Sequence, residues 1–259
     1  MAKKILSKGI DISYANGKID WSIMKNNVDW VIFRVGYGGN YVKQDDAQFK
    51  NNIEGCEKYG IPYGVYLYSY ADTADEVKSE AEHCIRLLKG HHPTMPVFYD
   101  MEEERIRVLG KDKILQHAKI FCRYITEAGY LYGTYCNKDW FTNYLTDKWY
   151  DSYPKWLAQY NNVVTYKGTY DIWQYSCTGR MPGHSGDFDM NYCYTSFLKG
   201  DVNCDGKITA ADARLALQAS AKLTKLNNIQ KWNADMNKDG KITAADAKAI
   251  LEVAAKIKK

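Results

Sequence analysis

Two acidic residues separated by one residue, Asp100 and Glu102, close an apolar stretch that begins at Val97 and reads V-F-Y-D-M-E. In an extended strand alternate side chains share a face, so both carboxyl groups point the same way, with backbones roughly 6–7 Å apart. Neighbouring carboxyl groups cannot both ionise freely, so one is held protonated while the other stays charged. Such a pair is equipped to cleave a glycosidic bond. The spacing is common, and an acidic strand end that enters a solvated loop is the alternative.

The elements that would position this pair alternate between strands and helices. Strands are predicted where short apolar runs are bounded by glycine or proline, and helices where apolar residues recur at helical spacing. The expected strands cover residues 9–13, 30–38, 62–71, 97–103, 131–136, 155–160, 170–176 and 188–193. The expected helices cover residues 19–26, 47–59, 74–88, 111–128 and 138–145.

Five strand–helix units followed by three further strands predict an α/β fold with a mostly parallel sheet that closes into a barrel. Active sites of such barrels lie at the C-terminal ends of the strands. Asp11 and Glu102 are near the ends of their strands. Asp189 begins its strand instead, so it reaches the same rim only if the last strand is antiparallel, which the short connections permit.

The composition is that of a globular protein with an excess of aromatic residues, namely 22 Tyr and 7 Trp among 259 residues. Flat rings suit sugar-binding clefts, although any single ring can equally be core packing. The net charge is +4, and the part before Gly200 carries as many acidic as basic residues, so no nucleic-acid partner is expected. No stretch is long and apolar enough to span a membrane, and the first eight residues have no apolar segment of signal-peptide length.

The seven cysteines form no CxxC pair and no metal-binding spacing, so most are expected to be small buried hydrophobic residues. Cys177 and Cys193 lie in neighbouring expected strands, and the sequence leaves open whether they pair. His91 and His92 precede the acidic strand. No matching set of metal ligands surrounds them, so a solvated loop is expected there.

The tail contains an internal duplication. Residues 201–212 read D-V-N-C-D-G-K-I-T-A-A-D, residues 235–246 read D-M-N-K-D-G-K-I-T-A-A-D, and an Ala-rich helix follows each. Oxygen-bearing residues recur at loop positions 1, 3, 5 and 12, with glycine at position 6, as calcium-binding loops require. Two structural Ca²⁺ ions are therefore expected. The expected ligands are Asp201, Asn203, Asp205, the Lys207 carbonyl and Asp212 in the first loop, and Asp235, Asn237, Asp239, the Lys241 carbonyl and Asp246 in the second.

Several segments of the first 198 residues, taken together and in order, resemble the family-25 glycoside hydrolases, the N-acetylmuramidases called Chalaropsis-type lysozymes. The segments are Gly9-Ile-Asp-Ile-Ser, Arg34-Val-Gly-Tyr-Gly-Gly, Gly64-Val-Tyr-Leu-Tyr-Ser, Val97-Phe-Tyr-Asp-Met-Glu, Trp156-Leu-Ala-Gln-Tyr, Ile172-Trp-Gln-Tyr and Asp187-Phe-Asp-Met-Asn. The resemblance implies a flattened (β/α)5(β)3 barrel similar to a TIM barrel. It also implies cleavage of the β-1,4 bond between N-acetylmuramic acid and N-acetylglucosamine in peptidoglycan.

The resemblance assigns roles to four acidic residues. Glu102 would be the general acid that protonates the leaving oxygen, and Asp100 would orient or stabilise the 2-acetamido group of the muramic sugar. That group would attack the anomeric carbon and give net retention, whereas a wide carboxylate separation would favour inversion by a water nucleophile. Asp11 and Asp189 would complete the acidic floor of the cleft. No cofactor is expected for catalysis.

Aromatic residues are candidates for the walls of the cleft, namely Tyr37, Tyr66, Tyr68, Tyr135, Trp156 and Tyr175. Other acidic residues are expected to lie outside it: Glu103 alternates away, and Glu104 lies past the strand. The family-18 chitinases also end a strand in D-x-E, but their longer acidic signature would need an aspartate where this chain has Phe98.

The duplicated tail resembles a dockerin, the small all-α module with two EF-hand-like loop–helix repeats that attaches enzymes to cohesin domains of scaffoldins. Position 12 is Asp rather than the Glu of sensor EF-hands, and the helix before each loop is weak, which argues against a calcium-switched sensor. The partner-choosing loop positions are Ala210-Ala211 and Ala244-Ala245, identical in both copies. With so short a core, the tail is expected to fold only with calcium.

Two domains are therefore expected, a glycoside hydrolase barrel over residues 1–198 and a dockerin over residues 199–259. The favoured function is a monomeric, extracellular peptidoglycan hydrolase that a cohesin-bearing scaffold holds. The location is inferred from the tail and the substrate. The alternative is a barrel that binds cell-wall glycan without cutting it. The joint presence of Asp11, Asp100, Glu102 and Asp189 favours the enzyme.

Overall fold

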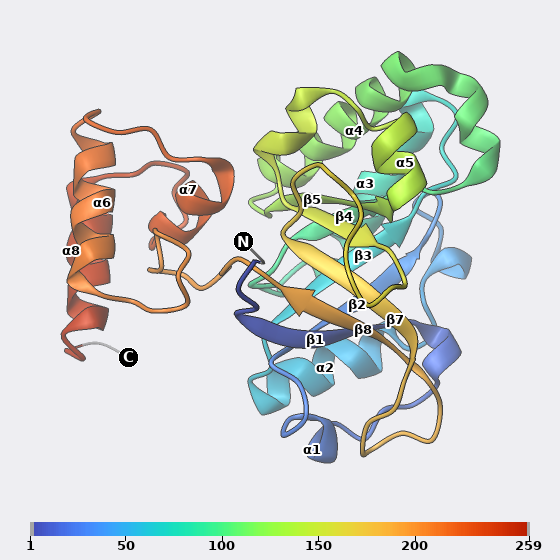
Figure 1. Cartoon of the computed structure of the whole chain (residues 1–259), viewed down its shortest axis with the longest axis horizontal. Coiled ribbons are helices and arrows are strands. Elements are labelled where there is room, and N and C mark those ends of the chain that lie inside the picture. Colours follow the sequence, from blue (N-terminus) through green and yellow to red (C-terminus); the bar gives the residue numbers. More distant parts are fainter. Residues whose placement is uncertain (1–2, 258–259) are drawn as a thin grey trace. The chain divides into compact units, whose positions relative to one another are not determined.

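The computed structural model describes residues 3–257, which form two compact units. The first unit extends to Cys193 and the second begins at Tyr194, somewhat before the boundary expected after residue 198. The first unit is an α/β barrel and the second is a small helical unit (Figure 1). None of the helices in residues 3–257 combines the length and apolarity that a membrane crossing needs.

Eight strands close the barrel in sequence order, from β1 to β8. Each strand from β1 to β6 runs parallel to the next one, whereas β8 is antiparallel to both β7 and β1. This confirms the expected barrel. The strands are β1 (Ser7–Ile12), β2 (Trp30–Tyr37), β3 (Tyr63–Tyr68), β4 (Val97–Asp100), β5 (Tyr132–Asn137), β6 (Lys155–Ala158), β7 (Ile172–Gly179) and β8 (Phe188–Cys193).

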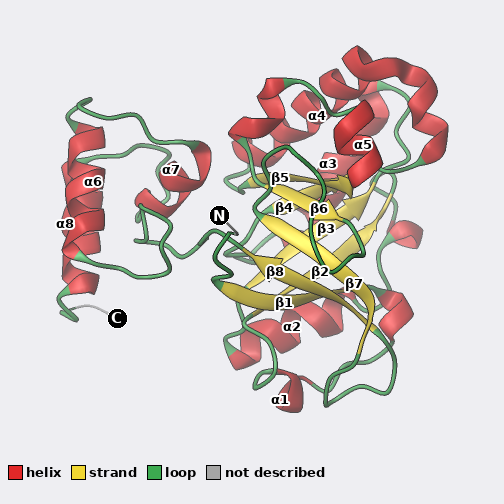
Figure 2. Ribbon diagram, viewed as in Figure 1, coloured by secondary structure: helices red, strands yellow, loops and turns green. Residues whose placement is uncertain are grey.

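The helices pack on the outside of the barrel, with α3, α4 and α5 on one side of it and α1 and α2 on the other, as Figure 2 shows. Their apolar faces are buried against the sheet, and their ends carry the expected signals. Gly60 ends α2 in the left-handed conformation, and Thr73 and Glu76 form a capping box at the start of α3. The barrel helices are α1 (Trp21–Met24), α2 (Phe49–Tyr59), α3 (Ala74–Leu88), α4 (Gly110–Glu127) and α5 (Lys138–Asn143).

Strand β4 shows how the alternation of side chains divides the barrel into two packed layers. Phe98 points into the barrel, where its ring lies 5.2 Å from that of Trp156. Tyr99 points outward and stacks on Phe121 of α4, with ring centroids 4.1 Å apart. The strand ends at Asp100, earlier than the sequence predicted, so Glu102 lies in the loop that follows it.

The second unit contains α6 (Ala210–Ser220), α7 (Asn228–Ala234) and α8 (Ala244–Ala254). Helices α6 and α8 lie side by side in Figure 1, and each begins with a capping box in which an aspartate bonds back to a threonine. Val202, Ala216 and Ile250 are fully buried in its core. The duplication of the sequence is therefore a duplication of structure.

The cysteines form no disulfide within residues 3–257. Cys177 is exposed, whereas Cys193 is buried and lies opposite Ile172 across the β7–β8 pair. Cys177 and Cys193, which the sequence left open as a pair, thus form no disulfide with each other.

Candidate active site

A pocket of about 200 Å³ opens at the C-terminal ends of the parallel strands and gathers all four predicted acidic residues. Asp11 and Asp100 come from the ends of β1 and β4, Glu102 from the loop after β4, and Asp189 from the start of β8. The pocket is lined by Asp11, Arg34, Tyr66, Tyr68, Asp100, Glu102, Tyr135, Trp156, Tyr160, Gln174 and Asp189.

The antiparallel course of β8 brings Asp189 to this rim, because Asp11 and Asp189 are direct partners across the β1–β8 pair. Asp11 is only 4 % exposed. Burial, followed by the charge of Asp189, raises the pKa of Asp11, and burial raises the pKa of Asp189 to about 6. The two carboxyl groups therefore hold a proton between them at mildly acidic pH.

Two side-chain amides hold Asp11 in place. Gln174 Nε2 and Asn191 Nδ2 donate to its Oδ2 at 2.8 and 2.7 Å. The indole nitrogen of Trp156 donates to Asn191 Oδ1 at 2.7 Å, and the Tyr135 hydroxyl donates to Gln174 Oε1 at 2.9 Å. Because an indole N–H can only donate, Trp156 fixes the Asn191 amide with its NH₂ group toward Asp11.

The second pair of carboxyl groups has few donors. Burial, followed by the charges of Glu102 and Asp11, raises the pKa of Asp100, and its buried Oδ1 has no hydrogen-bond partner among the described residues. Burial also raises the pKa of Glu102, which accepts one hydrogen bond, from Asn137 Nδ2 at 3.3 Å. This pair therefore keeps its protons to higher pH than ordinary carboxyl groups do, and it still has bonding capacity for a ligand.

Four of the six predicted wall residues line the pocket: Tyr66, Tyr68, Tyr135 and Trp156. The prediction was wrong for Tyr175, which does not line it and instead stacks on Tyr192 with ring centroids 4.1 Å apart. Because successive side chains of β7 point to opposite faces, the preceding residue, Gln174, lines the pocket instead. Tyr37 lines a neighbouring hollow rather than this pocket.

Sequence reasoning missed several polar residues of the pocket, notably Arg34, Tyr160 and Gln174. It also missed Asn137 and Asn191, which bind the acidic residues directly. Gln174 and Asn191 stand inside segments that carried the family resemblance, so a strand-by-strand assignment of faces could have found them. Asn137 has no such signal, because it ends a different strand, β5.

The other acidic residues and the histidine pair lie outside the pocket, as expected. Glu104 pairs with Arg107, and His91 with Glu57. Glu103 differs in one respect, because its carboxylate accepts a hydrogen bond from the hydroxyl of the wall residue Tyr68 at 3.1 Å. Glu103 therefore helps to hold the Tyr68 side chain in place without lining the pocket itself.

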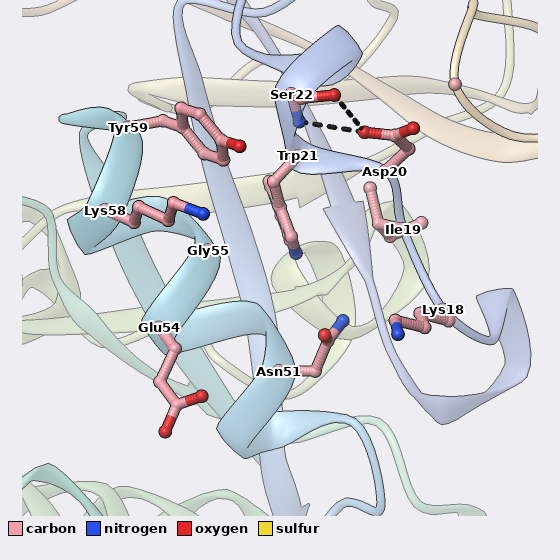
Figure 3. Close-up of a pocket in the computed structure, with 11 residues that line it drawn as sticks. Lys18, Ile19, Asp20, Trp21, Ser22, Asn51, Glu54, Gly55, Lys58 and Tyr59 are labelled. Atoms are coloured by element: carbon pink, nitrogen blue, oxygen red, sulfur yellow. Dashed lines mark hydrogen bonds between the residues drawn. The ribbon is translucent and has the colours of Figure 1, made fainter.

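Figure 3 shows another hollow, of about 570 Å³, whose lining comes largely from α1 and α2. The Trp21 ring fills the space above Gly55, where a Cβ would meet it at 2.2 Å. Of its two acidic residues, Asp20 and Glu54, the first accepts hydrogen bonds from Ser22, which lower the pKa of the Asp20 carboxyl group. This hollow shares no residue with the acidic pocket.

The two predicted calcium loops of the second unit are folded alike. The first aspartate of each loop, Asp201 or Asp235, accepts hydrogen bonds from the backbone amides at positions 5 and 6. The last one, Asp212 or Asp246, accepts them from the amide of position 2 or 3 and from the threonine at position 9. Each loop therefore curls around its own carboxylates.

The donor set of these loops fits a hard cation. Residues Asp201 and Asp212 are fully buried, and Gly206 and Gly240 have φ of 89° and 78°, which glycine at position 6 allows. No group of three or more Asp, Glu, His or Cys side chains within residues 3–257 is gathered as a metal site. Calcium would also need the asparagines Asn203 and Asn237 and the position-7 carbonyls, as oxygen ligands of the expected kind.

Comparison with known proteins decides the family. Residues 10–184 match Glycosyl hydrolases family 25. The chain belongs to this family. Residues 199–251 match the Dockerin type I domain, so the family 25 barrel is followed by a dockerin.

Several known proteins are similar to about three quarters of this chain. Lysozyme M1 from Streptomyces globisporus is 27 % identical over an alignment of 207 residues, which covers 71 % of this chain and 66 % of that protein. The modular autolysin LytC from Streptococcus pneumoniae is 30 % identical with a TM-score of 0.66, over 73 % of this chain and 46 % of that chain. The bacterial lysozyme from Streptomyces coelicolor shares the fold, at 22 % identity and a TM-score of 0.57, over 73 % of this chain and 93 % of that one. The chain thus spans less than two thirds of Lysozyme M1 and less than half of LytC.

Proposed function

We propose that this family 25 protein hydrolyses peptidoglycan at the β-1,4 bond between N-acetylmuramic acid and N-acetylglucosamine. The observation that carries the proposal is the gathering of four carboxyl groups with raised pKa values in one pocket. A glycosidase needs a protonated carboxyl group for the leaving oxygen and charged or hydrogen-bonding groups on the other side of the sugar. The similarity to Lysozyme M1 and to LytC supports the same class of substrate.

Glu102 is the general acid in this proposal. Its carboxyl group is partly exposed to the pocket, so it can reach a leaving oxygen, and burial keeps its proton at higher pH than an ordinary glutamate would. Once the proton is given up, the Asn137 amide is in place to stabilise the carboxylate. This one hydrogen bond stabilises the carboxylate that forms when Glu102 gives up its proton, while burial still raises the pKa of Glu102 before the reaction.

Asp100 orients the 2-acetamido group of the muramic sugar. It lies beneath Glu102 at the end of β4 and is 3 % exposed, and its unsatisfied Oδ1 can bond a substrate amide. The route with net retention uses that acetamido group as the nucleophile, whereas a water nucleophile would invert the product. Asp11 and Asp189 form the opposite side of the pocket and stabilise positive charge on the sugar ring.

The dockerin attaches the enzyme to a cohesin domain of an extracellular scaffold, and the proposal includes two calcium ions that stabilise it. The first would be held by Asp201, Asn203, Asp205, the Lys207 carbonyl and Asp212, and the second by Asp235, Asn237, Asp239, the Lys241 carbonyl and Asp246. Calcium supplies no chemistry to the barrel. It satisfies the acidic loops and so favours the folded tail.

The deciding experiment is digestion of purified peptidoglycan with the full chain, followed by borohydride reduction and mass spectrometry of the reduced ends. New muramitol ends are the expected result. New glucosaminitol ends would assign the other bond of the glycan strand. A folded protein that binds several wall types and cleaves none would favour the alternative, a glycan-binding barrel without activity.

A further inference from the structure

A second hollow, of about 520 Å³, adjoins the acidic pocket and has no part in the proposed reaction. The two share the side chains of Arg34 and Tyr68, so the hollow continues the pocket over the ends of β2 and β3. Its other lining residues include Tyr14, Tyr37, Tyr70 and Asp45. Four tyrosine rings next to the acidic pocket indicate a further ligand-binding site.

The rings of this tyrosine hollow are exposed and yet held in place. Tyr14 is 57 % and Tyr37 is 38 % exposed. The rings of Tyr37 and Tyr70 are in T-shaped contact, with their centroids 5.9 Å apart. The backbone amide of Tyr70 donates to the buried carboxyl group of Glu80 at 2.8 Å, and the Arg105 guanidinium lies 4.9 Å from the Tyr70 ring. The hollow is therefore formed before any ligand arrives, which lowers the entropy cost of binding.

The charged residues of the hollow already have partners. Arg34 pairs with Asp46 at 2.8 Å and lies over the Tyr14 ring at 4.6 Å. Asp45 is bound by both His83 and Arg86. What remains for a ligand is a set of flat rings and hydroxyl groups with balanced charge, which suits a neutral polyhydroxylated ring better than the carboxylates of a stem peptide.

We propose that the tyrosine hollow is a subsite for a sugar ring of the same glycan strand, beyond the rings that the acidic pocket holds. The inference rests on the proposed function and extends it. A strand long enough to reach the hollow gains a stacking contact, so the protein discriminates substrates by strand length.

The test compares kcat/KM on long and short glycan strands from which the stem peptides have been removed. Tyr37→Ala should lower the value on long strands by about fivefold, the size of one aromatic contact, and leave short strands within twofold. Tyr14→Ala, from a different segment, should act in the same sense. Tyr41→Ala is the matched control, because Tyr41 is 61 % exposed nearby but does not line the hollow.

The subsite would be overturned if the ratio of kcat/KM on long strands to kcat/KM on short strands were the same as in wild type for both Tyr37→Ala and Tyr14→Ala. A larger loss on peptide-bearing strands than on peptide-free ones would overturn the sugar assignment in favour of a stem peptide. If the wild-type chain cleaves neither substrate, the proposed function fails. The subsite is then tested by calorimetry with peptide-free strands, where equal affinities of wild type and Tyr37→Ala would refute it.

Discussion

Acidic residues gather in both units of this chain, but their hydrogen-bond partners differ. In the barrel, Asp11 and Glu102 accept hydrogen bonds from the side-chain amides of Gln174, Asn191 and Asn137. In the dockerin loops, carboxylates such as Asp201 and Asp212 accept them mainly from the backbone. A backbone donor follows from the turn itself, whereas an amide donor requires a second element.

This difference teaches how one residue type serves two kinds of chemistry. In the pocket, burial and neighbouring carboxyl groups raise pKa values, which favours proton transfer. In the second loop, burial opposes the charge of Asp246, but hydrogen bonds from Thr243 and other amides outweigh it and lower its pKa. The lowered pKa of Asp246 favours the charged form that binds a cation. The raised pKa values of Asp100 and Glu102 favour the protonated form that can transfer a proton.

The strongest test of the comparison replaces the acid itself. Glu102→Gln should lower peptidoglycan cleavage by about 10²- to 10⁴-fold while glycan binding is retained, because the amide keeps the shape but has no proton to transfer. Release of reducing ends and pull-down by insoluble wall measure the two. Glu103→Gln is the matched control, since Gln still offers an acceptor to Tyr68. Cleavage by Glu102→Gln within twofold of wild type would contradict the assignment.

The next test removes the cation. Excess chelator should increase hydrogen exchange throughout residues 194–257 and abolish cohesin binding, because like charges in each loop then repel and the small core cannot hold the fold. Cleavage by the barrel should change by less than twofold. Exchange in the tail that is equally slow with and without chelator would refute calcium-dependent folding. A loss of cleavage would mean that the two acidic regions do not act separately.

The smallest expected effect concerns Asn137, whose side-chain amide donates a hydrogen bond to Glu102. As the proposed general acid, Glu102 must be protonated to act, so the rate should fall as pH rises through its pKa. Asn137→Ser removes the amide donor and keeps an oxygen to cap α5, so the alkaline limb of kcat/KM should move up by about one pH unit. Asn137→Asp should move it further, since it adds a negative charge. A limb that stays in place or moves down would show that a different group sets it.

Much of the fold could be predicted from sequence because its signals are local. Helix α3 occupies the predicted residues 74–88, since a capping box begins it and helical spacing fills it. The two similar loops of the tail could be predicted for the same reason, because their repeated turn residues are also local signals. The end of β4 was less accurate, because a run of acidic residues does not show where strand pairing stops.

The site was only partly predictable because it depends on which strand faces meet. The four carboxyl groups could be found from their place at strand ends, yet Tyr175 was placed in the pocket instead of Gln174, a shift of one residue that reverses the face. Asn137 belongs to the site only because β5 lies beside β4 in the closed barrel. Such contacts join residues far apart in sequence and leave no local pattern.

The seam between β1 and β8 has a consequence for the order in which the protein is made. Asn191 and Asp11 are 180 positions apart in the chain, yet they bond directly at the seam. A growing chain that has not yet reached β8 lacks both this donor and Asp189, and its β1 has no partner on one side. Closing the barrel is therefore a late, long-range step, which folds slowly compared with local helices. The acidic pocket is complete only once translation has passed the last strand, so shorter translation products of the barrel have no working site.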